Sequence, residues 1–166
     1  KDWTHASGLT YNEEEALLTL SLMGLQAVLN VEDDGEVRHI FGGGSLSQDT
    51  TPLSDPPLVR PHGAKWQDKK LLVFHSPELQ SRGSILNVEA DPFWEQHFIS
   101  DIHALALGDI HVLSEEETLI NFGTAGQIQI FSATGESLFT LENALGSYFS
   151  HASWLKNLHQ ITPLSR

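Results

Sequence analysis

The stretch QAVLNVEDDGEVRHI, Gln26 to Ile40, decides the fold class. Two short runs in which apolar and polar side chains alternate flank the dipeptide Asp34-Gly35. Alternation with a period of two is typical of a half-buried strand, and Asp-Gly is a favoured centre of a tight hairpin turn. The stretch therefore predicts two antiparallel strands joined by a short turn.

The same pattern occurs twice more, as GSILNVEADPFWEQHF (83–98) and GQIQIFSATGESLFTL (126–141), with turn centres at Asp91-Pro92 and Thr134-Gly135. A second pair of apolar runs precedes each hairpin. These pairs are Gly8–Tyr11 with Leu17–Leu22, Ala64–Trp66 with Leu71–Phe74, and Ile110–Leu113 with Thr118–Phe122. The sequence thus predicts three units of four short strands.

Four-stranded units repeated every forty or so residues are typical of β-propeller blades, which bury their faces against neighbouring blades around an axis. The first interval is longer because it contains a loop, 42–61, rich in Gly, Pro, Ser and Asp. We expect an all-β, partial β-propeller that forms a single domain over residues 1–166. Its blades are predicted at about 2–43, 62–101 and 107–144, and a fourth begins near residue 147.

Closed propellers have about four to eight blades, so three blades predict a fragment that is completed by the remaining blades of a longer chain. The total blade number stays open. An all-β sandwich is the competing architecture, but it leaves the matched hairpins unexplained.

Composition narrows the possible partners. The net charge is −13, with only nine Lys and Arg residues, and nucleic acids require clustered cations. There is no cysteine, which excludes disulfides and thiolate metal sites. No run of apolar residues is long enough to span a bilayer, and the sequence contains no signal segment. We therefore expect neither a nucleic-acid partner nor a membrane span.

Three blocks of sequence occur in an order that resembles one known family. The blocks are Asp2-Trp3-Thr4-His5-Ala6-Ser7 through Tyr11; then Phe41-Gly42-Gly43, Pro61-His62-Gly63, Leu71-Leu72-Val73-Phe74 and Ser81-Arg82; and finally Leu113, Glu117-Thr118-Leu119-Ile120-Asn121 and Gly123. Together they resemble the bacterial aryl-sulfate sulfotransferases, or arylsulfotransferases, over nearly the whole chain.

The resemblance implies a β-propeller enzyme that moves a sulfuryl group from a phenolic sulfate ester to a phenol acceptor through a sulfohistidine. It implies no nucleotide donor, cofactor or metal, and a location in the periplasm or outside the cell. It also implies three histidines and one arginine at the site. His5 and His62 match two of these histidines, and Arg82 matches the arginine through its Ser-Arg context.

The nucleophile is harder to place. His151 is the candidate because it reopens the repeat in a His-Ala-Ser context like that of His5, while His103 and His111 are rivals. His5, His62 and His151 share one phase of the repeat, at the start of a unit's first strand. That strand lines the channel of a propeller, so we expect these imidazoles to converge.

The residue types suit sulfuryl transfer. A neutral imidazole is nucleophilic near neutral pH because its pKa is about 6.5, and attack on sulfur divides the transfer into two easier steps. Arg82 would supply a planar fork of donors for the sulfuryl oxygens. The donor and acceptor molecules and the oligomeric state are not fixed by the sequence.

Other functions stay open. The family's Gln-His-Asp is Pro-His-Gly here, at Pro61-His62-Gly63, and Phe74 is followed by His75; these departures favour a catalytically inactive propeller that binds a ligand or protein. A third hypothesis is a metal site of converging histidines. His39, His97 and His159 are predicted at the surface, and Trp3, Trp66 and Trp154 in the packing between blades.

Overall fold

A computed structural model of the chain describes residues 4–43, 58–77, 79–87 and 94–153. The described residues form three antiparallel four-stranded sheets, so the predicted all-β class and the three four-stranded units are confirmed. The Asp91-Pro92 turn, Trp3, Trp154 and His159 lie outside the described residues.

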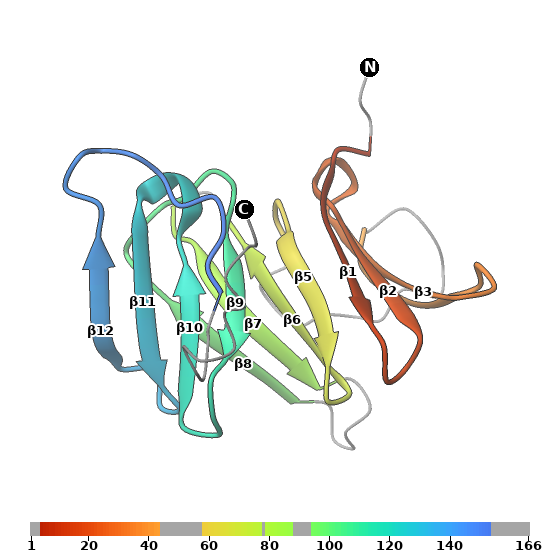
Figure 1. The fold of residues 1–166 in the computed structure, drawn as a ribbon. Helices are drawn as coiled ribbons and strands as arrows, with labels where there is room; N and C mark the ends of the chain where they lie inside the picture. Colours follow the sequence, from red (N-terminus) through yellow and green to blue (C-terminus); the bar gives the residue numbers. More distant parts are fainter. Residues whose placement is uncertain (1–3, 44–57, 78, 88–93, 154–166) are drawn as a thin grey trace, which may run out of the picture.

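The strands of each sheet are hydrogen-bonded in chain order (Figure 1). Sheet 1 contains β1 (Ala6–Asn12), β2 (Leu17–Leu22), β3 (Ala27–Glu32) and β4 (Val37–Gly42). Sheet 2 contains β5 (His62–Gln67), β6 (Lys70–His75), β7 (Arg82–Asn87) and β8 (Trp94–Ile99). Sheet 3 contains β9 (Asp109–Val112), β10 (Glu117–Asn121), β11 (Gln127–Ser132) and β12 (Ser137–Glu142). Two 3-10 turns that the sequence did not predict, η1 (Met23–Leu25) and η2 (Gly123–Ala125), link the second strand to the third in sheets 1 and 3.

Two of the predicted hairpin turns have the same geometry. Gly35 and Gly135 both have positive φ, at 90° and 85°, a region that glycine enters without a steric penalty. In the first turn the backbone N–H of Glu32 donates to the carbonyl of Glu36 at 2.8 Å. The periodic alternation and the turn chemistry therefore act together to set both hairpins.

Two apolar cores hold the three sheets in a row. Between sheets 1 and 2, the core contains Leu17, Val28, Phe41, Trp66 and Val73. Trp66 is buried, as predicted, and its ring stacks on His39 with 5.5 Å between the ring centroids. Between sheets 2 and 3, the core contains Leu72, Phe74, Phe98, Ile120, Phe122 and Phe131. Sheet 2 therefore contributes side chains to both cores.

The first strands of the sheets lie next to one another. Thr10 on β1 donates through Oγ1 to the carbonyl of Ala64 on β5 at 2.9 Å, and Asn12 donates through Nδ2 to the carbonyl of Trp66 at 3.0 Å. On the other side of β5, Lys65 reaches His111 on β9. The order β1, β5, β9 therefore brings residues distant in sequence to one place.

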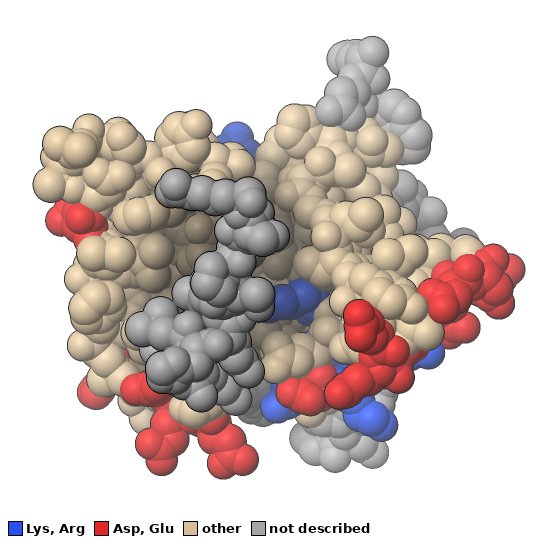
Figure 2. Space-filling model, in the orientation of Figure 1, with Lys and Arg blue, Asp and Glu red and all other residues tan. Residues whose placement is uncertain are grey.

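Acidic side chains gather at one end of the sheets. The β1–β2 turn carries Glu13 and Glu14, the β3–β4 turn carries Asp33 and Asp34, and the β9–β10 turn carries Glu115 and Glu116. These turns lie at the end where β1, β3 and β9 finish, and Figure 2 shows most of the red side chains along the lower edge and at the right. Much of the negative charge thus lies away from the end where β1, β5 and β9 begin.

Candidate functional site

The start of β5 approaches the start of β9 closely because residue 63 is a glycine. Gly63 has a φ of 53°, and a Cβ at this position would lie 2.7 Å from the carbonyl oxygen of Gly108 and 2.9 Å from Cβ of Asp109. A Cβ on Gly8 of β1 would lie 3.1 Å from the backbone nitrogen of Gly63. Glycine thus permits the contact that places Asp109 beside β5.

Asp109 is the centre of a polar cluster at this end. It is the first residue of β9, and its side chain is only 9% exposed. Its Oδ2 lies 2.9 Å from Nδ1 of His151 and accepts a hydrogen bond from the backbone N–H of Ala152 at 3.2 Å. Its Oδ1 lies 3.2 Å from Nε2 of His111, at ion-pair distance but without the alignment of a hydrogen bond. One carboxylate therefore faces two imidazoles.

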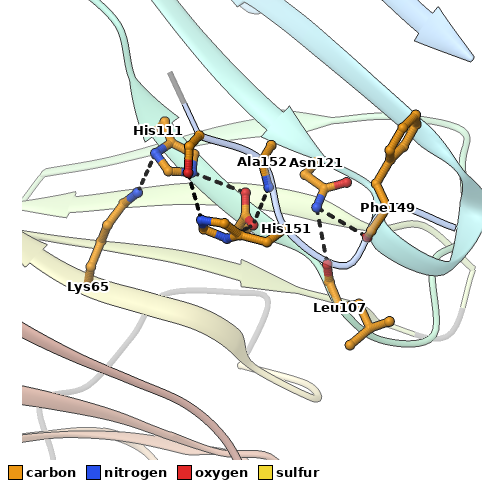
Figure 3. A network of polar contacts seen from close by, with 9 residues as sticks. Lys65, Leu107, His111, Asn121, Phe149, His151 and Ala152 are labelled. Atoms are coloured by element: carbon orange, nitrogen blue, oxygen red, sulfur yellow. Dashed lines mark hydrogen bonds and ion pairs between the residues drawn. The ribbon is translucent and has the colours of Figure 1, made fainter. Parts of the chain in front are cut away.

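The cluster extends to both sides of Asp109. Nζ of Lys65 on β5 lies 2.9 Å from Nδ1 of His111, and Oγ of Ser153 lies 2.9 Å from Nε2 of His151. Figure 3 shows Lys65 pointing toward His111, with His151 and Ala152 beside them. We name Lys65, His111, Asp109, His151 and Ser153 the Asp109 cluster.

The partners fix the tautomers. An ionised carboxylate only accepts hydrogen bonds, so Nδ1 of His151 carries the proton that Asp109 accepts, and Nε2 keeps its lone pair. The hydroxyl of Ser153 donates to that Nε2. An ammonium only donates, so Nδ1 of His111 accepts from Lys65, and the proton of neutral His111 sits on Nε2 facing Asp109. The side chain of His151 is 65% exposed.

Asn121 joins the segments that carry the cluster. It pairs with Asp109 across β9 and β10, and its Nδ2 donates to the carbonyls of Leu107 at 3.3 Å and Phe149 at 3.4 Å. Figure 3 shows the Asn121 amide between these two residues. A backbone hydrogen bond of 3.1 Å from Phe149 to Gly123 further fixes the segment that leads to His151.

Burial and charge set the protonation of the cluster. Burial by itself would raise the pKa of Asp109, but contacts with His111 and the N–H of Ala152, together with the charges of His111 and His151, hold that pKa below its usual value. Burial lowers the pKa of Lys65 to about 8, against the opposing charge of Asp109. At neutral pH the cluster therefore holds one carboxylate and one ammonium that is close to its titration point.

His62 and His5 lie at the same end, on β5 and immediately before β1. His62 is 6% exposed, and its Nε2 is buried without a hydrogen-bond partner. Burial lowers the pKa of His62, a contact with the backbone of Ser7 opposes this, and the charge of nearby His5 lowers it further. His62 is therefore a neutral imidazole at pH 7, whereas His5 is exposed.

Arg82 lies on the third strand of sheet 2, next to a different histidine. It is paired with His75 across β6 and β7. Burial, together with the charges of Arg82 and His97, lowers the pKa of His75 to about 3. Phe74 pairs with both His62 and Gly83, so Arg82 lies at the same end of sheet 2 as His62, two strands away from it.

A second polar chain crosses sheet 2 near Arg82. Oγ of Ser84 lies 2.8 Å from both Nε2 of His75 and Nδ1 of His97, and Nε2 of His97 lies 3.1 Å from Glu95. His97 is half-buried, so the prediction that it lies at the surface is wrong. Its contact with Ser84 holds the imidazole against the sheet. His39 is half-buried as well, because it stacks on Trp66.

Sequence reasoning found only part of the site. His151, proposed as the nucleophile, and His111, named as a rival, lie together in the Asp109 cluster, while the other rival, His103, is exposed between β8 and β9. Lys65 and Asp109 were not predicted. Their positions in the repeat are the signal that was available: Asp109 pairs with Asn121 as Gly8 pairs with Ser21, and Lys65 pairs with Leu72 as Thr10 pairs with Thr19 and His111 with Leu119.

No model of a protein family matches the chain, and neither does any curated protein. Within the described residues, no group of three or more His, Asp or Glu side chains is arranged to hold a metal ion. No helix in this part of the chain is long and apolar enough to cross a membrane.

Proposed function

We propose that the three sheets are blades of a β-propeller and that the chain transfers sulfuryl groups in the manner of the arylsulfotransferases. Supporting the propeller are the strand order within each sheet, the packing of sheets in a row, and the adjacency of β1, β5 and β9. In such a ring the first strands surround the axis, and the Asp109 cluster would lie at one mouth of the channel.

The observation that carries the proposal is the contact between Asp109 and His151. A sulfuryl acceptor needs a nitrogen lone pair that is exposed and held in one direction, and Asp109 provides this by accepting the Nδ1 proton of His151 at 2.9 Å. The same contact stabilises the positive charge that develops on the imidazole ring as Nε2 becomes bonded to sulfur.

The transfer has two balanced steps. When the hydroxyl of Ser153 rotates away, Nε2 of His151 attacks the sulfur of an aryl sulfate, the S–O bond to the aromatic ring breaks, and its electron pair leaves on the phenolate oxygen, which is then protonated. In the second step, an acceptor phenol loses its proton and attacks the same sulfur. The N–S bond then breaks and its electron pair returns to Nε2.

Nearby side chains can meet the other requirements of sulfuryl transfer, which are donors for the sulfuryl oxygens and a group that exchanges protons with the phenols. The three non-bridging sulfuryl oxygens need fixed donors, which Lys65 and Arg82 would supply as the ammonium and the guanidinium at this end. Lys65, with a pKa of about 8, is also suited to give a proton to a leaving phenolate and to take one from an incoming phenol. Neutral His62 and exposed His5 are proposed to contact the sulfate or the phenol oxygen.

The substrates in this proposal are a phenolic sulfate ester and a phenol, and the location is the periplasm or the cell exterior. Both follow from the resemblance of the sequence blocks. No nucleotide or metal takes part in the proposed steps.

The test is to incubate the protein with 4-nitrophenyl sulfate and phenol, follow release of 4-nitrophenol and formation of phenyl sulfate, and measure the intact mass of the trapped protein. We expect a mass gain equal to one SO3 group, located on His151 by peptide sequencing. His151→Ala should abolish both signals, whereas His103→Ala, at an exposed site, should leave them unchanged. Exchange that persists in His151→Ala, or a folded protein that shows neither signal, would contradict the proposal.

A further inference from the structure

A serine, a histidine and an aspartate lie in a line beside β9, the first strand of sheet 3. Oγ of Ser153 lies 2.9 Å from Nε2 of His151, and Nδ1 of the same ring lies 2.9 Å from Oδ2 of Asp109. The imidazole therefore has a hydroxyl at one nitrogen and a carboxylate at the other. In acyl transfer, this arrangement makes a serine hydroxyl a nucleophile.

The proton positions agree with these roles. A carboxylate only accepts hydrogen bonds, so Nδ1 of His151 carries a proton and Nε2 carries the lone pair. The hydroxyl of Ser153 thus donates toward the nitrogen that would remove its proton. Although burial by itself would raise the pKa of Asp109, its contacts with His111 and with the N–H of Ala152 hold that pKa below its usual value. The ionised carboxylate can therefore stabilise the imidazolium that forms.

Ala152 fixes the segment that carries the serine and the histidine. Its backbone N–H donates to Oδ2 of Asp109 at 3.2 Å, and Figure 3 shows it beside His151. Ala152 is buried, whereas His151 and Ser153 on either side of it are exposed. This alternation places His151 and Ser153 on the same side of the segment. The contact between hydroxyl and imidazole is therefore held at the surface of the protein.

Sheet 2 contains the same residue types in a different setting. Oγ of Ser84 lies 2.8 Å from Nδ1 of His97, and Nε2 of His97 lies 3.1 Å from Glu95. However, Ser84 is only 1% exposed, and its Oγ also lies 2.8 Å from Nε2 of His75. Ser84 is thus enclosed, and of the two serines only Ser153 has the exposure that a substrate requires.

We propose that Ser153, His151 and Asp109 hydrolyse carboxylate esters of phenols, with Ser153 as the nucleophile, His151 as the general base and acid, and Asp109 as the group that orients the imidazole. The leaving group decides the substrate class. A phenol has a pKa of about 10, so a phenolate leaves far more readily than the amine of an amide. Within the Asp109 cluster, the ammonium of Lys65 is the cation available to stabilise a tetrahedral oxyanion.

The hydrolysis has two balanced steps. Oγ of Ser153 attacks the ester carbon while its proton passes to Nε2 of His151. The bond from that carbon to the phenol oxygen then breaks, and the phenolate takes the proton from Nε2. In the second step, a water molecule attacks the acyl carbon and gives a proton to Nε2, the bond to Oγ breaks, and Oγ regains the proton. The products are a phenol and a carboxylic acid.

This inference goes beyond the sulfuryl transfer proposed above and does not rest on it. The two reactions use different nucleophiles, Oγ of Ser153 for the ester and Nε2 of His151 for the sulfate. A carboxylate ester also carries no sulfuryl group. Ester hydrolysis without a mass gain on His151, and a mass gain on His151 without ester hydrolysis, are therefore distinct results.

Hydrolysis of 4-nitrophenyl acetate by the intact chain, followed through release of 4-nitrophenol over many turnovers, tests the proposal. Ser153→Ala and His151→Ala should each lower kcat/KM by at least about 100-fold. The matched control is Ser137→Ala, since Ser137 is an exposed serine on β12 whose hydroxyl lies 3.5 Å from that of Thr140. This variant should keep the full rate, and circular dichroism verifies that each variant keeps its strands.

A covalent probe locates the nucleophile without relying on any variant. Diethyl 4-nitrophenyl phosphate transfers its phosphoryl group to an activated serine hydroxyl and releases 4-nitrophenol. We expect one diethylphosphoryl group per chain, located on Ser153 by peptide sequencing, and no label on Ser84. Turnover that persists in Ser153→Ala, a label on a different residue, or a folded wild-type chain that neither turns over the ester nor takes the label would overturn the proposal.

Discussion

At Asp109, two carboxylate oxygens face two imidazoles, and this decides which nitrogen of His151 is basic. Oδ2 accepts the Nδ1 proton at 2.9 Å, and the lone pair is left on Nε2 of a side chain that is 65% exposed. Neighbours in sequence cannot provide this contact, because Asp109 and His151 are separated by the whole of sheet 3. The proposed chemistry therefore depends on which ring nitrogen of His151 carries the proton.

Asp109→Asn should disturb the tautomer of His151 with little change in shape. An amide offers a donor as well as an acceptor, so His151 can move its proton to Nε2 and accept from the amide at Nδ1. We expect sulfation of His151 to slow by about 100-fold, and the ring nitrogen chemical shifts of His151 to show the proton on Nε2. Asp68→Asn, on the exposed β5–β6 turn, is the control. An unchanged tautomer in Asp109→Asn would refute the assigned role of the carboxylate.

Lys65→Met tests the buried ammonium through stability. Because burial lowers the pKa of Lys65 to about 8 from its ordinary 10.5, the unfolded chain binds a proton between these values that the folded chain does not. The free energy of unfolding of the wild type should therefore rise with pH, relative to the variant, by at most about 1.4 kcal/mol per pH unit from pH 8 to 10.5. Urea unfolding across this range measures the difference. Parallel curves for the two proteins would show that the pKa of Lys65 is not lowered.

At the scale of elements, glycines govern how closely the sheets approach. Gly63 permits β5 to meet the start of β9, and Gly108 lies against the ring of Phe74, with no room for a Cβ. Phe74 is fully buried and belongs to the core between sheets 2 and 3. The approach that positions Asp109 is thus coupled to the packing of an entire interface.

Gly108→Ala should therefore cost more stability than a glycine substitution in an open turn. A methyl group at residue 108 must displace the Phe74 ring, and we expect the free energy of unfolding to fall by about 2 kcal/mol or more. Gly35→Ala is the comparison: Gly35 has a φ of 90°, and a Cβ added there would have no atom within 4 Å, so only backbone strain of about 1 kcal/mol applies. Urea unfolding ranks the two variants, and an equal or larger loss in Gly35→Ala would contradict this account of the interface.

At the scale of the whole molecule, the acidic turns are separated from the Asp109 cluster. The acidic turns lie at one end of the sheets (Figure 2). The Asp109 cluster lies toward the end where the first strands begin. This arrangement reduces, but does not remove, the repulsion between a protein with a net charge of −13 and an anionic donor.

The rate of reaction with an aryl sulfate should accordingly rise with ionic strength. Salt screens long-range repulsion between like charges, so we expect kcat/KM for the anionic donor to increase, by less than about tenfold, between low and physiological salt. The acceptor phenol is neutral, so its kcat/KM should change little and provides the internal control. A fall in kcat/KM for the donor on adding salt would indicate that local cations, not the net charge, dominate the approach of the substrate.

The sequence by itself determined the strands, because alternation and turn chemistry are local properties. Leu17–Leu22, Asp34-Gly35 and Thr134-Gly135 were all placed correctly for this reason. It also placed His62 at the start of the second unit, where β5 begins. It could not reveal that His97 turns inward to Ser84, which depends on the strand beside it.

Only the tertiary structure decided which side chains meet. Lys65 and Asp109 each resemble an ordinary charged residue in the sequence, and their importance arises from β5 and β9 lying side by side, which is a consequence of packing between sheets. Packing also decided that His62 is buried and neutral while His5 is exposed. Local patterns determine the alternation along a strand because they involve neighbouring residues. Contacts between residues that are tens of positions apart depend on which apolar faces pack together, where glycines allow close approach, and which buried charges have partners.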